Sequence, residues 1–162
     1  MEREVKVGRR EAARVVSKRL PALVSELPRV MSSAFGEVYG FLASHGIEPK
    51  GPPFVIYHEL LVDDEPMEIE ICAPVHRAVD PPAGWSFHEL PAGEFATLLH
   101  VGPYDTVGAA YGSMTTWLVE HGYAPAGPPR EVYLSGPETP PDEIRTIIEL
   151  PVVASRRPVA TG

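Results

Sequence analysis

Two stretches of the chain, residues 44–57 (SHGIEPKGPPFVIY) and residues 120–133 (EHGYAPAGPPREVY), align without a gap at an offset of 76 residues. Half of the aligned positions are identical, and the same offset places residues 34–36 (AFG) on residues 110–112 (AYG). Chance does not maintain one register over such a distance, so the sequence predicts an internal duplication.

The duplication divides the chain into two repeats with a linker between them. We expect the first repeat at about residues 4–78, the linker at 79–85 and the second repeat at about 86–153. The linker contains the run DPPAG, and proline and glycine at this density interrupt regular structure. Residues 1–153 are therefore predicted to form a single domain, followed by a tail at 154–162 that lacks any pattern and is expected to fray.

Each repeat carries the pattern strand–helix–strand–strand. Apolar residues recur every three or four positions, as on one face of a helix, in residues 28–45 and 106–120. Runs rich in β-branched and aromatic residues predict the strands, at residues 14–19, 54–61, 67–73, 94–101, 131–134 and 145–150. Two such units predict an α+β fold with antiparallel sheets, helices on one face and a ligand cleft between the repeats.

Composition and charge narrow the possible function classes. Of the 162 residues, 44% are hydrophobic and 22% are charged, which indicates a globular protein. Its 19 prolines and 14 glycines are expected to separate the regular elements from one another. The net charge of −8 argues against direct binding of nucleic acid. Half of the 14 Lys and Arg residues lie in residues 1–20, where we expect a solvated strand or arm, with a polyanion-binding arm as the alternative.

The sequence carries no signal for a membrane segment or a cofactor. No apolar run approaches the ~18 residues of a membrane span, and the single cysteine, Cys72, fits a reducing compartment, so we expect a cytoplasmic location. The six histidines lack metal-binding spacing, so neither a metal nor another cofactor is predicted. His45 and His121 are repeat mates at the ends of the predicted helices, where we expect them to act as caps. The oligomeric state stays open.

Several motifs occur in order in the second repeat: HVGPY (100–104), then AYG, HGY (121–123) and PPREVYL (128–134). Together with GPPF in the first repeat, they closely resemble the GyrI-like (AraC-type) effector-binding domain over about residues 4–153. The resemblance implies a tandem fold with a ligand cleft between the repeats. Members of that family include drug-sensing domains of multidrug regulators, gyrase-inhibitor proteins and standalone proteins proposed to hydrolyse cyclopropanoid toxins. Because the first repeat begins within the first few residues, the chain looks like a standalone member.

The resemblance also implies a glutamate on a strand inside the cleft, and Glu131 occupies the matching position. Alternation along a strand predicts that Glu131 and Tyr133 face the cleft while Val132 and Leu134 pack against the helices. The repeat mate of Glu131 is Val55, so a carboxylate stands where the other repeat holds an apolar residue. An ionisable group at such a position is a candidate site residue. The alternative is a surface glutamate paired with Arg130 or Arg145.

Aromatic side chains are expected to complete the ligand site, because ring faces attract organic cations. The predicted ligand-binding residues are Glu131, Tyr133, Tyr57, Tyr104, Tyr111, Trp85, Trp117 and His100. Core packing is the alternative role for Tyr111 and Trp117, and Trp85 is either a flap or a packing anchor. Glu68 and Glu70 alternate with isoleucines on one strand face, where we expect them to be exposed, although they could add negative charge to the cleft.

These observations predict a standalone domain that binds hydrophobic, often cationic aromatic compounds in drug sensing or toxin resistance. The first alternative is a hydrolase of cyclopropanoid or related electrophiles, with Glu131 as general acid/base and Tyr104 as a second catalytic residue. The second alternative is a gyrase-inhibitor-like role in protein interaction. The predicted partner is a hydrophobic or cationic small molecule, with no direct role for nucleic acid or membrane.

Overall fold

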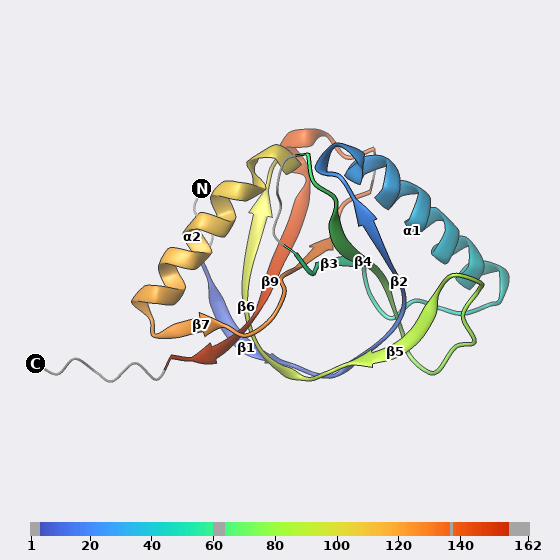
Figure 1. Ribbon diagram of the computed structural model, residues 1–162, viewed down its shortest axis with the longest axis horizontal. Coiled ribbons are helices and arrows are strands. Elements are labelled where there is room, and N and C mark those ends of the chain that lie inside the picture. Colours follow the sequence, from blue (N-terminus) through green and yellow to red (C-terminus); the bar gives the residue numbers. More distant parts are fainter. Residues whose placement is uncertain (1–3, 60–63, 137, 156–162) are drawn as a thin grey trace, which may run out of the picture. The chain divides into compact units, whose positions relative to one another are not determined.

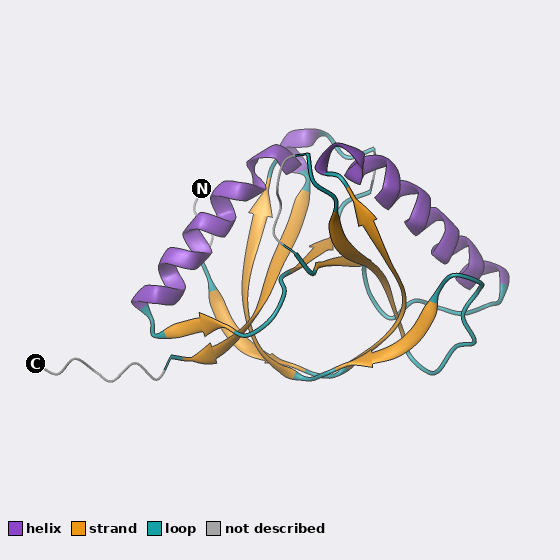
Figure 2. Ribbon diagram, viewed as in Figure 1, coloured by secondary structure: helices purple, strands orange, loops and turns teal. Residues whose placement is uncertain are grey.

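The computed structural model describes residues 4–59, 64–136 and 138–155, which form two compact units. Unit 1 comprises Met1–Arg10 with Gly93–Gly162, and unit 2 comprises Glu11–Ala92. Each unit combines one long helix with antiparallel strands (Figure 2). The expected α+β class with antiparallel strands is therefore confirmed. In the part of the chain that the structure describes, no helix is long and apolar enough to cross a membrane.

Unit 2 is a four-stranded sheet with helix α1 on one face (Figure 1). Its elements are β2 (Ala13–Ala22), a 3₁₀ turn (Val24–Glu26), α1 (Leu27–Ser44), β3 (Phe54–Tyr57), β4 (Met67–Val75) and β5 (Ser86–Leu90). The strand order is β5-β2-β4-β3, and all pairs are antiparallel. The buried residues of α1 are Ala34, Val38 and Leu42. On the surface, Lys18 of β2 pairs with Glu37 of α1 at 3.8 Å.

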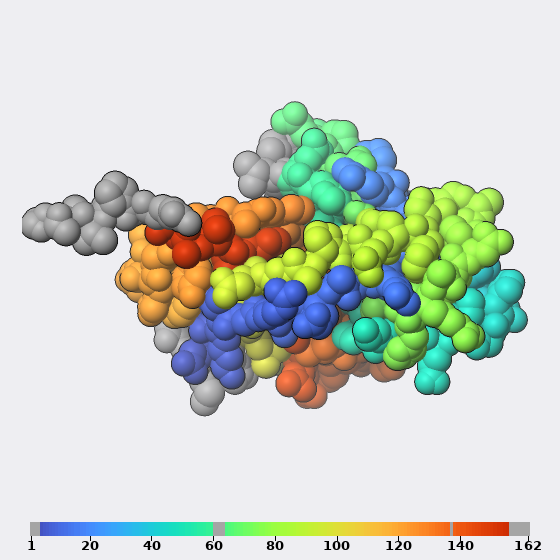
Figure 3. Space-filling view, turned by 90° about the horizontal axis from the view of Figure 1, so that it is seen from below, coloured from blue at the N-terminus to red at the C-terminus, as the bar shows by residue number. Residues whose placement is uncertain are grey.

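Unit 1 is built in a similar way around helix α2. Its elements are β1 (Lys6–Arg10), β6 (Gly93–Val101), a 3₁₀ turn (Tyr104–Thr106), α2 (Val107–Glu120), β7 (Tyr123–Pro125), β8 (Arg130–Tyr133), a 3₁₀ turn (Pro141–Glu143) and β9 (Arg145–Ala154). The strands are ordered β1-β6-β9-β8, and β7 pairs with the last residues of β9. Figure 3 shows β1, in blue, running beside the yellow-green atoms of β6.

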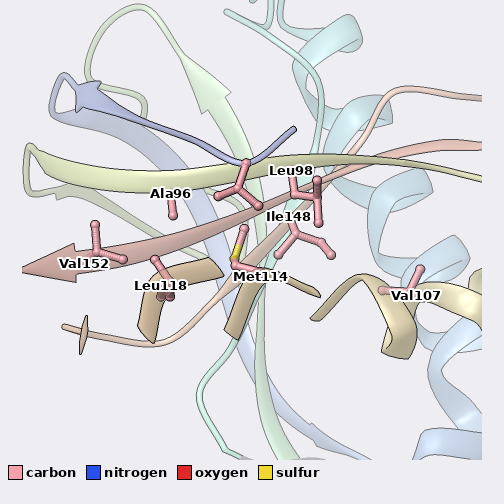
Figure 4. Close-up of a cluster of buried hydrophobic side chains, with 8 residues drawn as sticks. Ala96, Leu98, Val107, Met114, Leu118, Ile148 and Val152 are labelled. Atoms are coloured by element: carbon pink, nitrogen blue, oxygen red, sulfur yellow. The ribbon is translucent and has the colours of Figure 1, made fainter. Parts of the chain in front are cut away.

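The core of unit 1 lies between α2 and the sheet (Figure 4). Met114 and Leu118 of α2 meet side chains from both central strands: Ala96 and Leu98 of β6, and Ile148 and Val152 of β9. All six are at most 5% exposed, and burial of each larger side chain contributes about 1.5–3 kcal/mol. This packing fixes α2 over the strands that carry the candidate site.

Substitution of Ile148 with valine tests this core. Ile148 is fully buried, so loss of one methylene should lower the free energy of unfolding by about 1 kcal/mol. Chemical denaturation measures this difference. Val119 of α2 is 67% exposed, so Val119→Ala is the control and should stay within about 0.5 kcal/mol of the parent protein. If both variants lost the same free energy of unfolding, Ile148 would not be part of the core.

The repeated His-Gly pair ends both helices. Gly46 and Gly122 have positive φ angles of 65° and 76°, a conformation that favours glycine after a helix. Nδ1 of His45 lies 3.0 Å from the carbonyl oxygen of Phe41, and Nδ1 of His121 lies 2.8 Å from that of Trp117. Since a carbonyl can only accept, both rings donate, and the two histidines act as the expected caps.

Two strands outside the predicted pattern complete the sheets. β5 follows the expected linker but pairs with β2 in unit 2, and β1 pairs with β6 in unit 1. Edge strands of this kind are short and carry weak apolar patterns, so periodicity does not reveal their partners. The predicted end of the strand at residues 60–61 and most of the predicted tail (156–162) lie outside the described residues.

Four of the basic residues near the N-terminus are paired with carboxylates. The ion pairs are Arg10–Glu149 (3.3 Å), Arg14–Glu89 (3.8 Å), Lys18–Glu37 (3.8 Å) and Arg19–Glu68 (3.1 Å). Such ion pairs are typical of a solvated strand surface. The positive charge of each of these four residues is already balanced by a carboxylate. This arrangement favours the solvated strand over the polyanion-binding arm.

Candidate functional site

Glu131 is a buried carboxylate on β8. Only 9% of the residue is exposed, and its register partner on β9 is Ile148. Opposite residues of an antiparallel pair share a face of the sheet. Because Ile148 packs in the core beneath α2, Glu131 also points to the face that α2 covers.

This orientation corrects the predicted phase of β8. We expected Val132 and Leu134 to pack against the helix, but Leu134 is 40% exposed and Val132 lies on the face opposite to Glu131. Glu131, Val132 and Tyr133 are all buried, so both faces of the strand are covered. When a strand is buried on both faces, the alternation of polar and apolar residues does not show which residues point toward the helix. The prediction relied on that alternation and therefore assigned Val132, instead of Glu131, to the face that α2 covers.

Two tyrosine hydroxyls meet the Glu131 carboxylate, one on each oxygen. Tyr111 of α2 donates to Oε2 at 2.9 Å, and Tyr133 of β8 donates to Oε1 at 3.0 Å. Hydrogen bonds to the charged form of a carboxylate stabilise that form. The pair of tyrosines therefore supports a negative charge in a position that water barely reaches.

Tyr104 is the exposed member of this group. Its ring meets that of Tyr133 edge to face, with the centroids 5.9 Å apart, and 48% of the residue is exposed. Partial burial, and then the nearby charge of Glu131, raise the pKa of the Tyr104 hydroxyl. The preceding Gly102 has a φ of 138°, a backbone conformation that side chains rarely adopt, and it directs the chain from β6 into the turn that carries Tyr104.

The structure thus brings together Glu131, Tyr104, Tyr111 and Tyr133 in unit 1. Two other predicted ligand residues, His100 and Trp117, also belong to unit 1 but line a separate groove that none of these four residues lines.

The remaining two predicted residues lie in unit 2. Tyr57 is 8% exposed, and its hydroxyl lies 3.9 Å from the sulfur of Met31. Trp85 is 6% exposed, and Nζ of Lys18 lies 5.8 Å from its ring. These contacts favour the packing-anchor role of Trp85 over a flap.

A second buried carboxylate, Glu70 of β4, was expected to be exposed, but it is only 3% exposed. Ser17 of β2 donates to Oε2 at 2.7 Å, His88 of β5 contacts the same oxygen at 2.7 Å, and His58 contacts Oε1 at 2.8 Å. Burial alone would raise the pKa of Glu70, but these three hydrogen bonds outweigh it and hold the pKa below its usual value. The prediction that Glu70 is exposed was wrong, because its partners are distant in the sequence and only the pairing of the strands brings them to it.

The described residues contain no group of three or more His, Cys, Asp and Glu side chains that could hold a metal ion. Glu131 and the tyrosine hydroxyls bound to it supply a carboxylate and two O–H groups. Such a group can pair with a cation or exchange a proton with a bound molecule.

Comparison with known proteins identifies the family of the chain. Residues 5–153 match the GyrI-like family, described as a GyrI-like small molecule binding domain, and the chain belongs to this family. The resemblance seen in the sequence is thereby confirmed. No curated protein sequence matches the chain significantly.

Solved structures provide further likenesses. The chain resembles the EcmrR C-terminal domain with 25% identity and a TM-score of 0.78, covering 95% of this chain and 99% of that one. In the EcmrR–DNA complex the identity is 26% and the TM-score 0.83, and the match covers 95% of this chain but only 59% of EcmrR.

Two more distant structures share the fold. One is a hydrolase encoded by lin2189 from Listeria innocua, with 14% identity, a TM-score of 0.70, and coverage of 94% of this chain and 93% of that one. The other is SAV2435 bound to tetraphenylphosphonium, with 14% identity, a TM-score of 0.62, and coverage of 93% and 94%.

Proposed function

We propose that this small-molecule-binding domain recognises hydrophobic organic cations through Glu131, in a drug-sensing or toxin-resistance role. The observation that carries the proposal is the carboxylate of Glu131, a residue that is 9% exposed, held between two tyrosine hydroxyls. A negative charge with so little access to water interacts strongly with an opposite charge that replaces that water.

The surrounding rings add to the attraction for a cation. Tyr104, Tyr111 and Tyr133 all lie around the carboxylate, and a ring face contributes about 0.5–2 kcal/mol toward a cation placed over it. The net charge of −8 attracts cations from a distance as well. SAV2435, which has this fold, is bound to tetraphenylphosphonium in its solved structure, and this supports the same ligand class here.

Calorimetric titration with tetraphenylphosphonium tests the proposal. Triphenylphosphine oxide is a neutral control that carries similar phenyl rings. We expect the cation to bind at least tenfold more tightly, because the carboxylate contributes only to the charged compound. Equal affinity for the two compounds would contradict recognition by charge.

A hydrolase acting on cyclopropanoid electrophiles is the second candidate. The tyrosine hydroxyls 2.9 and 3.0 Å from the carboxylate favour it, because they could pass a proton to or from Glu131. In such a reaction Glu131 removes a proton from water, the oxygen attacks a ring carbon, and the released carbon receives a proton as the C–C bond breaks. Mass spectrometry of a cyclopropanoid compound incubated with the protein tests this activity. A mass increase of one water supports hydrolysis, and an unchanged compound contradicts it.

A further inference from the structure

Glu131 is covered by its own neighbours, so a ligand needs a route to it. Only 9% of Glu131 is exposed, and Tyr133 beside it is 7% exposed. Tyr104 is the member of the group that reaches solvent, and its ring meets that of Tyr133 edge to face. Partial burial, and then the negative charge of Glu131, raise the pKa of the Tyr104 hydroxyl, so the two groups lie near each other. A compound that approaches the carboxylate past these rings therefore meets Tyr104 first.

Tyr104 stands on a short turn that is fixed at both ends. Gly102 before the turn is buried, and its N–H donates to the carbonyl oxygen of Ile144 at 2.8 Å. Val107 after the turn is 6% exposed and belongs to the core beneath α2 (Figure 4). The residues between these anchors, 104–106, are all exposed. A segment with few buried contacts opens locally at a low cost in free energy, while its buried anchors stay in place.

A side-chain hydrogen bond fastens this turn to β6. Nε2 of His100 lies 2.8 Å from the hydroxyl of Thr106, at the end of the turn. Thr106 stands at the N-cap of α2, where a threonine hydroxyl usually accepts from an N–H of the first helical turn, but it makes no such bond to the described residues. The hydroxyl instead contacts His100 and the carbonyl oxygen of Pro103. Among the described residues, no other hydrogen bond joins Tyr104, Asp105 or Thr106 to a strand.

We propose that the turn from Pro103 to Thr106 is a lid over Glu131, and that the bond between His100 and Thr106 is its latch. This inference rests on the proposed role of Glu131 as the contact for the charge of the ligand. The lid moves Tyr104 away from the carboxylate for entry and exit, and it closes over both the free and the occupied site. Because the latch stabilises the closed lid in both states, its loss speeds entry and exit alike and leaves the affinity nearly unchanged. Loss of a direct ligand contact would change mainly the dissociation rate.

The variant Glu131→Cys measures the opening of the lid without any ligand. A methanethiosulfonate reagent with a trimethylammonium group forms a mixed disulfide with the new thiol and releases methanesulfinate, and mass spectrometry follows the rate. In this background, Thr106→Val and His100→Phe each remove the latch, and we expect each to raise the labelling rate about three- to tenfold. Cys72 is 0% exposed, so it should add little to the labelling.

Two comparisons show whether the bond itself is responsible. Thr116→Val is the matched control, because Thr116 is exposed on α2 and lies outside the turn, and it should leave the labelling rate unchanged. The double variant of His100→Phe with Thr106→Val should label no faster than the faster single variant, since both changes remove the same bond. The lid is overturned if neither single variant labels faster, if Thr116→Val has the same effect, or if the two single effects multiply.

Binding kinetics of tetraphenylphosphonium, with Glu131 intact, separate the lid from the proposed function. Stopped-flow fluorescence should show that Thr106→Val raises the association and dissociation rate constants together, about three- to tenfold, while Kd stays within about twofold of the parent. A rise in the dissociation rate alone would overturn the lid, because Thr106 would then act as a ligand contact. These rates also decide the question if Glu131→Cys does not fold. If tetraphenylphosphonium does not bind the parent while the labelling rates respond to the latch, the proposed function fails and the lid stands.

Discussion

Glu131→Gln is expected to weaken binding of tetraphenylphosphonium by about 10- to 100-fold while leaving the fold intact. The loss corresponds to about 1.5–3 kcal/mol, the range for interactions of a polar group with a charged one. Glutamine keeps the size of the side chain. Its carbonyl oxygen accepts from one tyrosine, and the other hydroxyl can rotate to accept from the amide. The substitution therefore removes the charge with little change in packing.

Isothermal titration calorimetry measures the effect, and Glu94→Gln is the matched control. Glu94 is an exposed residue of β6 in the same unit, so its substitution changes the net charge equally without touching the site. We expect the control to bind like the parent protein. If Glu131→Gln and Glu94→Gln gave the same affinity, the buried carboxylate would have only a structural role, and the proposed recognition of cations would fall.

The repeated segments explain why much of the fold was predictable. The His-Gly pairs after α1 and α2 specify helix ends by local chemistry, since glycine takes the positive φ angle and the histidine ring caps a carbonyl. The apolar periodicity of α2 likewise identifies Met114 and Leu118 as core residues, because it depends only on helix geometry. Features of this kind are encoded within a few residues of each other.

The candidate site was predicted only in part, because its arrangement depends on contacts between distant segments. Glu131 stood out as a carboxylate where the repeat mate Val55 is apolar, but the face it occupies is set by the pairing of β8 with β9. His100 and Trp117 were grouped with Glu131, yet they lie on the other flank of α2, along the groove. The presence of several aromatic residues in the sequence does not show on which side of α2 each side chain lies.

Removal of the Glu70 carboxylate has the largest expected effect on stability. Glu70→Ala would leave Ser17, His58 and His88 without their shared acceptor in a position that is 3% exposed. Loss of one partner from a buried charged network costs about 3–5 kcal/mol. Folded domains have about 5–15 kcal/mol in total, so the variant should unfold at clearly lower denaturant concentration.

Two further variants keep this prediction testable if Glu70→Ala does not fold. His88→Ala removes one donor whose side chain is 42% exposed, and should cost about 1 kcal/mol. Glu89→Ala is the control on the same strand, because its side chain is 58% exposed and its pair with Arg14 spans 3.8 Å. A surface pair contributes about 0–1 kcal/mol at most, so this control should unfold almost like the parent.

The contribution of Glu70 should also depend on pH, with a sign fixed by its lowered pKa. In the unfolded chain a glutamate has a pKa near 4.3, and in the folded protein the hydrogen bonds hold the pKa of Glu70 lower. The stabilisation is therefore fully present above about pH 4.3 and is lost as the pH falls through the folded pKa. Urea unfolding at pH 7 and pH 3 should show a large stability gap between the parent protein and Glu70→Ala at pH 7 and a narrower one at pH 3. A gap of equal size at both pH values would mean that packing, and not the ionised carboxylate, holds β2, β4 and β5 together here.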